Sequence, residues 1–390
     1  MKKLFSALSS LLLSVVSLAV FAPGVVHAIA PYTCTWTGAT NNNFNTAGNW
    51  TGCNSAAPQP GDGDSLVFNQ PSSATTLTND ITGLTLNSIT FQGSNSGNFT
   101  IAGNGISLAG GISVTSHTGN SLQLPLTLTA PQTFAGLGID STSSLNVGSN
   151  ALTISNGPFI FDSISGSGAI TVNGAVQPQA FVPGLYLNGS SPNYSGTITI
   201  ASGQNLSITA DTGNLGTASI VVQNGGSLTL NGAADTATFS NNISVAGTGI
   251  NGYGAIISCL DSGQGCSEDG HNTTLNLTGA LTLTGDTQIA NGAFAGSQNP
   301  APASSATFNL TGALTANGHT IAAIPNSNTI LAGNLVVTAN KTTTPATTAK
   351  TPNTGFGASK NRPFIALGGA VLVSGALLVA SRSKLVRGRR

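Results

Sequence analysis

The densest group of side chains that could do chemistry lies in the segment 259–271 (CLDSGQGCSEDGH). It holds the carboxylates Asp261, Glu268 and Asp269 and the imidazole of His271. Their spacing does not follow the alternating ligand positions of an EF-hand loop, which weakens a calcium interpretation. Functional loops commonly project from rigid scaffolds. We therefore predict a ligand-contact loop without a bound metal or cofactor, and the alternative is a solvated insertion.

Other catalytic patterns are missing from the sequence. It contains no H-E-x-x-H helix motif, no G-x-S-x-G elbow and no phosphate-binding P-loop. Asp62 and Asp64 lie in a Pro-Gly-Asp-Gly-Asp stretch, which is typical of a turn stabilised by Asx side chains. We predict a non-catalytic protein. The alternative is a surface polysaccharide hydrolase on a β-helix scaffold that uses two aspartates, as inverting glycosidases use two carboxylates.

The charges are strictly segregated along the chain. Charged residues make up 6% of the 390 residues, and residues 4–340 contain no Lys or Arg. All acidic residues lie between Asp62 and Asp286. A nucleic-acid partner needs a basic surface that neutralises phosphates, so we predict no nucleic-acid binding. The absence of Lys and Arg also excludes a lyase activity in this region, because lyases on β-helices use Lys or Arg to abstract a proton beside a bound uronate.

Four cysteines form two groups that are close in sequence, Cys34 with Cys53 and Cys259 with Cys266. An even number of cysteines in an exported chain is typical of disulfides. Three connectivities exist, and pairing within each group is the simplest of them. The first pair would close a loop around a segment that holds both tryptophans of the chain, Trp36 and Trp50. We expect these rings to cap the end of a repetitive fold; the alternative is a platform on which carbohydrate stacks.

Residues 65–339 repeat short runs in which aliphatic residues alternate with Thr or Ser, separated by Gly and Asn turns. Alternation with period two indicates strands with one aliphatic face and one hydroxyl face. The seven residues from Asn276 to Thr282 recur from Asn309 to Thr315. These features predict an all-β parallel β-solenoid, entered through an N-terminal cap at residues 29–64. Tandem β-sandwich domains are the alternative, because turn spacing alone does not separate the two.

The two ends of the chain are typical of targeting segments. Residues 1–28 have two lysines, an apolar run and a small-residue cleavage site, as in a secretory signal peptide. Residues 340–351 form a Thr/Pro-rich stalk. Residues 363–381 are apolar and long enough to span a bilayer as a transmembrane helix. The basic tail at 382–390 is expected in the cytoplasm, so the rest of the chain is expected outside the cell.

A short motif precedes the apolar span. It consists of Thr351, Pro352, Asn353, Thr354 and Gly355. Together with the span and the basic tail, it resembles the cell-wall sorting signal of Gram-positive-type surface proteins, L-P-x-T-G, with Thr351 where Leu is usual. The resemblance implies a sortase that cuts between Thr354 and Gly355 and joins Thr354 to peptidoglycan. The alternative is a turn before a retained membrane anchor.

Two other stretches resemble the autotransporter-associated β-strand (passenger-type) repeat family. The first runs from Trp36 through Asn49-Trp50 to the Pro-Gly-Asp stretch and Val67-Phe68. The second is Asn193-Tyr194-Ser195-Gly196-Thr197 and the strand after it. The resemblance implies a right-handed parallel β-helix on a bacterial surface, often in adhesion. The chain departs from that family at its C-terminus, where a single apolar span replaces a membrane β-barrel.

These observations converge on one expectation. The chain should be a bacterial cell-surface anchored adhesin or structural surface protein, held in the cell wall or by a single-pass membrane span. Its partners should be a sortase and peptidoglycan at the anchor, and a cell-surface, glycan or matrix ligand at the ectodomain.

Overall fold

The fold was obtained as a computed structural model, which describes residues 31–70, 75–93, 98–115, 119–140, 143–175, 183–209, 215–260, 272–292 and 305–334. The chain divides into two compact units, residues 1–341 and 342–390, and the second lies wholly outside the described residues. The predicted signal peptide (1–28), stalk, sorting-like motif, span and basic tail also lie outside them. Among the described residues, no helix is both long and apolar enough to cross a membrane.

The described residues are almost entirely β-strand. The largest sheet contains β1 (Thr33–Trp36), β2 (Trp50–Thr51), β3 (Ser65–Gln70), β4 (Thr76–Asn79), β6 (Ser88–Gly93), β7 (Thr100–Gly103), β9 (Ile112–Val114), β10 (Ser121–Gln123), β12 (Gln132–Gly136), β13 (Ile139–Asp140), β15 (Leu152–Ser155), β16 (Phe159–Phe161), β18 (Ile170–Asn173), β19 (Leu185–Leu187), β20 (Thr197–Ile200), β21 (Asn205–Thr209), β22 (Ser219–Val222), β23 (Ser227–Gly232), β25 (Asn242–Gly247), β26 (Ile256–Leu260), β28 (Leu281–Asn291), β30 (Leu314–Thr315) and β31 (Ile321–Ala323).

Two smaller sheets complete the coils. One contains β5 (Thr85–Leu86), β8 (Ile106–Leu108), β11 (Leu126–Leu128), β14 (Ser144–Asn146) and β17 (Ser163–Ser165). The other contains β24 (Thr236–Phe239), β27 (Thr273–Leu277), β29 (Ala306–Leu310) and β32 (Thr329–Gly333). Two short 3-10 turns, η1 (Ala47–Asn49) and η2 (Ile250–Gly252), interrupt the strands.

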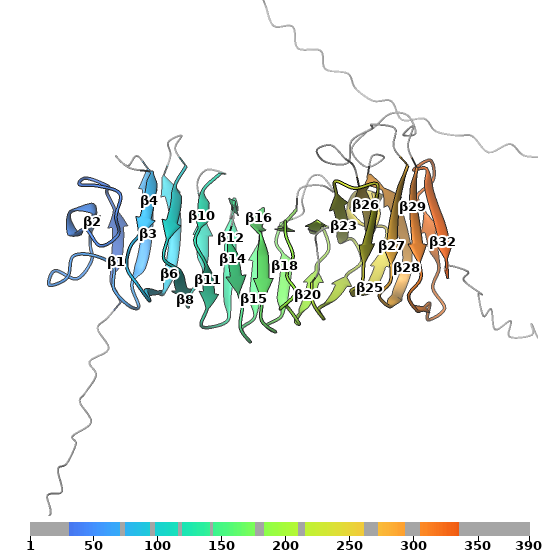
Figure 1. Cartoon of the computed structure of the whole chain (residues 1–390), viewed down its shortest axis with the longest axis horizontal. Coiled ribbons are helices and arrows are strands. Elements are labelled where there is room, and N and C mark those ends of the chain that lie inside the picture. Colours follow the sequence, from blue (N-terminus) through green and yellow to red (C-terminus); the bar gives the residue numbers. More distant parts are fainter. Residues whose placement is uncertain are drawn as a thin grey trace, which may run out of the picture. The chain divides into compact units, whose positions relative to one another are not determined.

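Apart from β2, which pairs antiparallel with β1, the strands of the largest sheet form two parallel series, which we call face 1 and face 2. Face 1 runs β1-β3-β6-β9-β12-β15-β18-β20-β22-β25-β28-β30, and face 2 runs β4-β7-β10-β13-β16-β19-β21-β23-β26-β28-β31. The long strand β28 belongs to both series. Each coil therefore supplies one strand to each face and passes on to the next coil, as in a parallel β-solenoid (Figure 1).

Parallel pairing distinguishes this fold from the alternative expected from sequence. Of the described strand pairs, only β1 with β2 is antiparallel. β-Sandwich domains are built from antiparallel sheets, so the prediction of tandem sandwiches is wrong for the described residues. The all-β, largely parallel prediction is confirmed.

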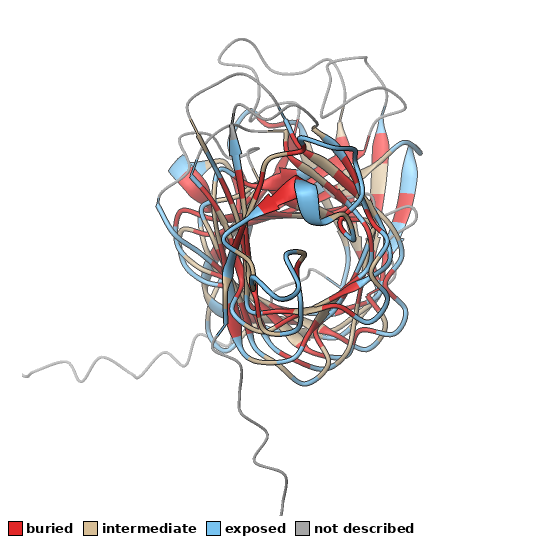
Figure 2. Ribbon diagram, turned by 90° about the vertical axis from the view of Figure 1, so that its left-hand side faces the viewer, coloured by how far each residue is buried: buried red, intermediate tan, exposed pale blue. Residues whose placement is uncertain are grey.

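The core lies inside the coils. On face 1, Ile170, Ile198 and Ile220 are in register on three successive strands, and all are buried. The intervening threonines Thr171 and Thr199 lie on the other side of the sheet and are half-buried. Figure 2 accordingly shows buried residues alternating with more exposed ones along the strands that enclose the core. The period-two pattern thus produces one aliphatic column for each inward position.

The internal repeat has a direct structural basis. Asn276 and Asn309 are in register on β27 and β29, and the Asn309 Nδ2 donates to the Asn276 Oδ1 at 2.8 Å. The glycine of the repeat is also required, because a Cβ on Gly312 would collide with the carbonyl oxygen of Gly279 in the preceding coil. The repeated residues of the two coils therefore stack directly on one another, through both their side chains and their backbone.

Candidate functional site

The described residues only partly cover the predicted sites. Cys34 and Cys53 are joined, with an S–S distance of 2.05 Å, which is the predicted local pairing. Cys259 is also disulfide-bonded, whereas Cys266 lies outside the described residues. The predicted ligand loop and the sorting motif lie outside them as well: Asp261, Glu268, Asp269, His271, Thr351, Pro352, Asn353, Thr354 and Gly355.

The strand that leads into the predicted ligand loop is unusually well anchored. All five residues of β26 are buried, on both sides of the sheet. Ile256 and Leu260 belong to the main core, whereas Ile257 packs on the outer side with Ile250 of η2 and the half-buried Tyr253. A second, small apolar cluster thus fixes the outer side of β26. The described chain is therefore packed on both sides of the sheet as far as Leu260, and the ligand loop after it stays a prediction.

A neutral hydrogen-bond network continues this covered outer side onto neighbouring strands. The Thr229 hydroxyl donates to the Asn205 Oδ1 at 3.1 Å, and both residues are buried. The Asn231 amide donates to the Ser207 hydroxyl. The Ser227 hydroxyl accepts from the Ile250 N–H at 3.0 Å and donates to the Gly254 carbonyl at 2.8 Å, which holds η2 against β23.

This covered region corrects one sequence-based expectation. The alternating pattern predicts that Thr and Ser on the outer face meet water, yet Ser207, Thr229 and Asn205 are buried. The threonines and serines themselves do not indicate the burial, because an outward Thr has the same alternating pattern whether or not another segment lies over it. A row of outward positions that includes the aliphatic Ile257 is the one hint that was available.

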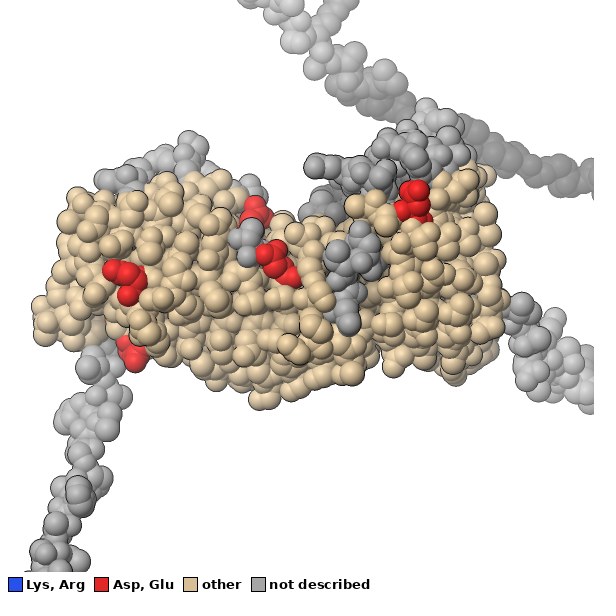
Figure 3. Space-filling model, in the orientation of Figure 1, with Lys and Arg blue, Asp and Glu red and all other residues tan. Residues whose placement is uncertain are grey.

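Elsewhere the outer surface carries hydroxyl groups that are hydrogen-bonded from coil to coil. The Thr197 and Ser219 hydroxyls are 3.0 Å apart on β20 and β22, and the Ser88 hydroxyl donates to the Ser65 hydroxyl at 2.9 Å. Figure 3 shows scattered acidic residues and no basic ones on the described surface that it presents. This surface can bind through neutral donors and acceptors over many coils.

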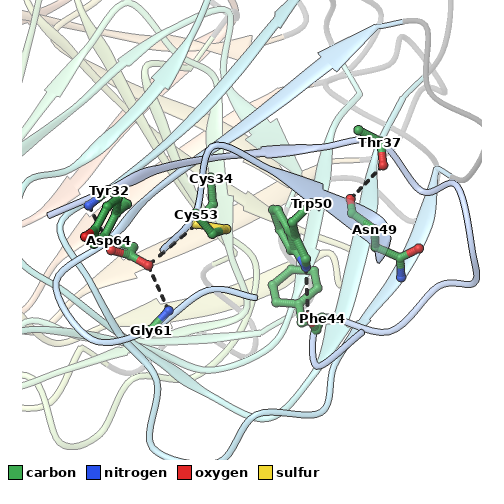
Figure 4. The surroundings of a disulfide bond; sticks show 9 residues. All are labelled: Tyr32, Cys34, Thr37, Phe44, Asn49, Trp50, Cys53, Gly61 and Asp64. Carbon is green, nitrogen blue, oxygen red and sulfur yellow. Dashed lines mark hydrogen bonds between the residues drawn. A yellow bond between two sulfur atoms is a disulfide. The ribbon is translucent and has the colours of Figure 1, made fainter. Parts of the chain in front are cut away.

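The N-terminal cap brings the first disulfide beside a buried carboxylate (Figure 4). Asp64 accepts from the Tyr32 N–H and from the Gly61 N–H, each at 2.9 Å. Its Oδ2 also lies 3.5 Å from the Cys34 sulfur, which as a disulfide sulfur has no proton to donate. Asp62 accepts from the Thr85 N–H at 2.9 Å. Asp64 therefore bonds a backbone amide of its own turn, at Gly61, as predicted, whereas Asp62 bonds the backbone 23 residues further on.

The two tryptophans fill the end of the core. Trp36 and Trp50 are 2% and 5% exposed, with ring centroids 4.9 Å apart. Phe44 lies against both rings, and the Trp50 indole N–H donates to its carbonyl oxygen at 2.8 Å. Rings buried in this way offer no open face, so the alternative of a carbohydrate platform at these tryptophans is wrong.

Tyr194, in the second family-like stretch, also has a structural position. It is fully buried, and its hydroxyl donates to the Gly168 carbonyl of the preceding coil at 3.0 Å. Burial raises the pKa of Tyr194 far above its usual range, so the phenol stays protonated and keeps donating this bond.

One exposed acid has a defined set of partners. The Asp286 Oδ1 accepts from the Thr320 N–H at 2.9 Å and from the Thr320 hydroxyl at 3.0 Å, and the His319 Nδ1 lies 3.9 Å away. The two bonds from Thr320 lower the pKa of Asp286, and His319 adds a weaker effect. The bonds between Asp286 and Thr320 join β28 to the turn before β31, so Asp286 is part of the scaffold.

Among the described residues, no three His, Cys, Asp or Glu side chains come together in a group that could hold a metal ion. Comparison of the chain with protein families, curated proteins and solved structures finds no match.

Proposed function

We propose that this chain is a non-catalytic bacterial surface protein, an adhesin or structural protein whose solenoid is displayed outside the cell and anchored through its C-terminal segment. The coils would form a right-handed parallel β-helix. The segment 351–355 would be the substrate of a sortase that joins the chain to peptidoglycan, and the segment 363–381 would hold the chain in the membrane before that step.

One observation supports this proposal above the others. Within the described residues, hydroxyl and amide side chains are bonded from coil to coil along a parallel stack that has no Lys or Arg and only scattered acidic residues. Like charges at such stacked positions would repel, whereas neutral polar groups satisfy one another and still meet a ligand. A long surface of this kind suits contact with another surface or polymer.

The absence of Lys and Arg from residues 4–340 provides a direct test of display and of adhesion together. Trypsin cuts after Lys or Arg, so trypsin added to intact cells should release the ectodomain uncut, in a fragment that ends at Lys341 or Lys350. We expect cells to lose attachment as this fragment appears. Shaved cells that attach as before would contradict adhesion, and a chain that external trypsin never releases would contradict display.

A matched variant separates the two modes of anchoring. Lys341→Gln with Lys350→Gln removes each trypsin site between the ectodomain and Thr354. A chain joined to the wall at Thr354 should then resist release. A chain that keeps its span still carries the trypsin site after Lys360, whereas Arg362 is protected by Pro363. Trypsin should continue to release such a chain, and that release would disprove the sortase step.

A further inference from the structure

One column of outward side chains on face 1 consists of threonines in direct register. Thr133, Thr153, Thr171 and Thr199 are paired in this order on β12, β15, β18 and β20. Each of these side chains is at least partly open to solvent. Paired strands lie about 4.8 Å apart, so the column presents one hydroxyl and one methyl group at each such repeat.

The same column continues towards the C-terminal end of the stack. Val221, Ser244, Thr282 and Thr315 follow in register on β22, β25, β28 and β30. All four are also at least partly open to solvent, and only Val221 lacks a hydroxyl. We call this column, from Thr133 to Thr315, the hydroxyl row.

The fold does not use the hydroxyls of this row. Among the described residues, none of these hydroxyls has a hydrogen-bond partner in the protein. The column beside the row differs, because the Thr197 and Ser219 hydroxyls are 3.0 Å apart. The covered side of face 2 differs as well, because the Thr229 hydroxyl donates to the Asn205 Oδ1. The row therefore holds regularly spaced donors and acceptors that are free to bond outward.

The neighbours of the row are small and uncharged. From β12 to β22, the other outward strand residues are Ala135, Ser155, Asn173, Thr197 and Ser219. No aromatic ring lies among them, so the row offers neither a face on which a sugar could stack nor the aromatic anchor of a protein interface. No charge lies among them to attract an ionic polymer. What the row offers a partner is its regular spacing.

We propose that the hydroxyl row binds ice. Each free hydroxyl can hold a water molecule, and the register repeats these waters at the separation of the strands, about 4.8 Å. Water molecules in ice repeat along one lattice direction at a closely similar distance, whereas those of the liquid have no fixed spacing. The methyl groups between the hydroxyls leave contact with liquid water when the lattice forms against them, which is favourable.

The rigid fold makes these weak contacts cumulative. A single Thr that holds a water gains little, but the backbone pairing already fixes the positions of its neighbours in the row. Once one coil is in place on the lattice, the others need no further ordering. This inference goes beyond the proposed function, because it concerns the coils alone and holds whether or not the chain is displayed or anchored.

Partition into growing ice tests the proposal on the purified full-length chain in detergent. Ice is grown slowly from the solution, and the ratio of chain in the ice to chain in the remaining liquid is compared with that of a reference protein in the same detergent. Wild type should be enriched in the ice. Thr199→Tyr should lose this enrichment, because it raises a large ring in the middle of the row, and Thr171→Tyr should do the same.

The matched control is Thr127→Tyr. Thr127 is also a half-buried outward threonine on a strand, but it lies on β11 of a smaller sheet, in register with Ser107. This variant should be enriched in ice as wild type is. Tyr is well tolerated on strands, so all three variants should keep the melting temperature of wild type, which shows that a loss of enrichment is not a loss of fold.

Each other outcome overturns the proposal. Wild type that partitions like the reference protein does not bind ice, and equal enrichment of all variants would place the ice contact elsewhere. If the row variants lose binding to insoluble cellulose or chitin while ice enrichment stays, the row is a glycan site. If they turn a dimer into a monomer and ice enrichment stays, a second copy covers the row. None of these outcomes depends on display, which release by trypsin tests separately.

Discussion

The two ends of the coil stack cover their last core residues differently. At the N-terminal end, Trp36, Phe44 and Trp50 are buried, and β2 folds back antiparallel on β1 with Trp50 paired to Trp36. At the C-terminal end, Leu314, Ile321 and Leu331 are only partly buried, and Ile330 is 50% exposed. Phe308, in register with Leu331 one coil earlier, is fully buried.

The difference shows how a solenoid ends its core. The N-terminal end uses large rings and a disulfide, because a terminal coil has no neighbour to cover it. The described C-terminal coil has no such rings, and its aliphatic side chains stay partly exposed. Substitutions at the two ends should therefore lower the free energy of unfolding by unequal amounts.

The largest expected effect is at the aromatic end. Trp50→Ala should destabilise the protein by about 3–5 kcal/mol, because it opens a cavity between Trp36 and Phe44 and removes the bond to the Phe44 carbonyl. The matched change Leu331→Ala removes a partly buried side chain and should cost about 1 kcal/mol. Denaturant unfolding of the full chain measures both. Equal losses would contradict the difference between the ends.

The disulfide should contribute slightly less than the rings. Cys34→Ala with Cys53→Ala releases a loop whose ends are 19 residues apart, and we expect a loss of about 3 kcal/mol. The loss should vanish when wild type is compared with the variant under reducing conditions. A variant as stable as the oxidised wild type would show that the aromatic cluster alone holds the cap.

Several features of this comparison were predictable from sequence. Alternation in segments such as Thr197–Ile200 predicts strands with an inner aliphatic side, and the repeat of Asn276 at Asn309 predicts stacking, because both depend on local periodicity. Two nearby cysteines and two tryptophans predict a cap. Periodicity is a property of one strand, however, and the cover over a strand comes from a distant segment.

The covered outer face shows this limit. Thr229 and Thr199 have the same alternating context, yet Thr229 is buried and Thr199 is half-buried. Only the fold reveals that η2 and its neighbours lie against β23 and β26. The ligand loop stays a prediction, because residues 261–271 lie outside the described ones, and the burial of both sides of β26 before it was not predictable.

This contrast leads to a prediction of intermediate size. Thr229→Val should cost about 1–2 kcal/mol, because it removes the hydroxyl that donates to the Asn205 Oδ1 in a buried setting. Thr199→Val makes the same chemical change at a less buried outward position and should be within about 0.5 kcal/mol of wild type. Thermal unfolding of the two variants in parallel checks the ranking. A reversed ranking would mean that the cover over β23 contributes no stability.

The smallest expected effect concerns Asp286, near the C-terminal end. Its pKa is lowered by the bonds from Thr320, so its contribution to stability is present above the pKa of an unfolded aspartate and is lost as the pH falls through the folded pKa. Asp286→Asn should therefore be slightly less stable than wild type at neutral pH, and the two melting temperatures should converge in acid.

Thr320→Val removes only the hydroxyl donor, so it should reduce the pH dependence without abolishing it. Because Asp286 is fully exposed, solvent and salt screen the interaction, and the difference at neutral pH should shrink at high ionic strength. A difference that grows in acid would have the wrong sign for a carboxylate held in its charged form.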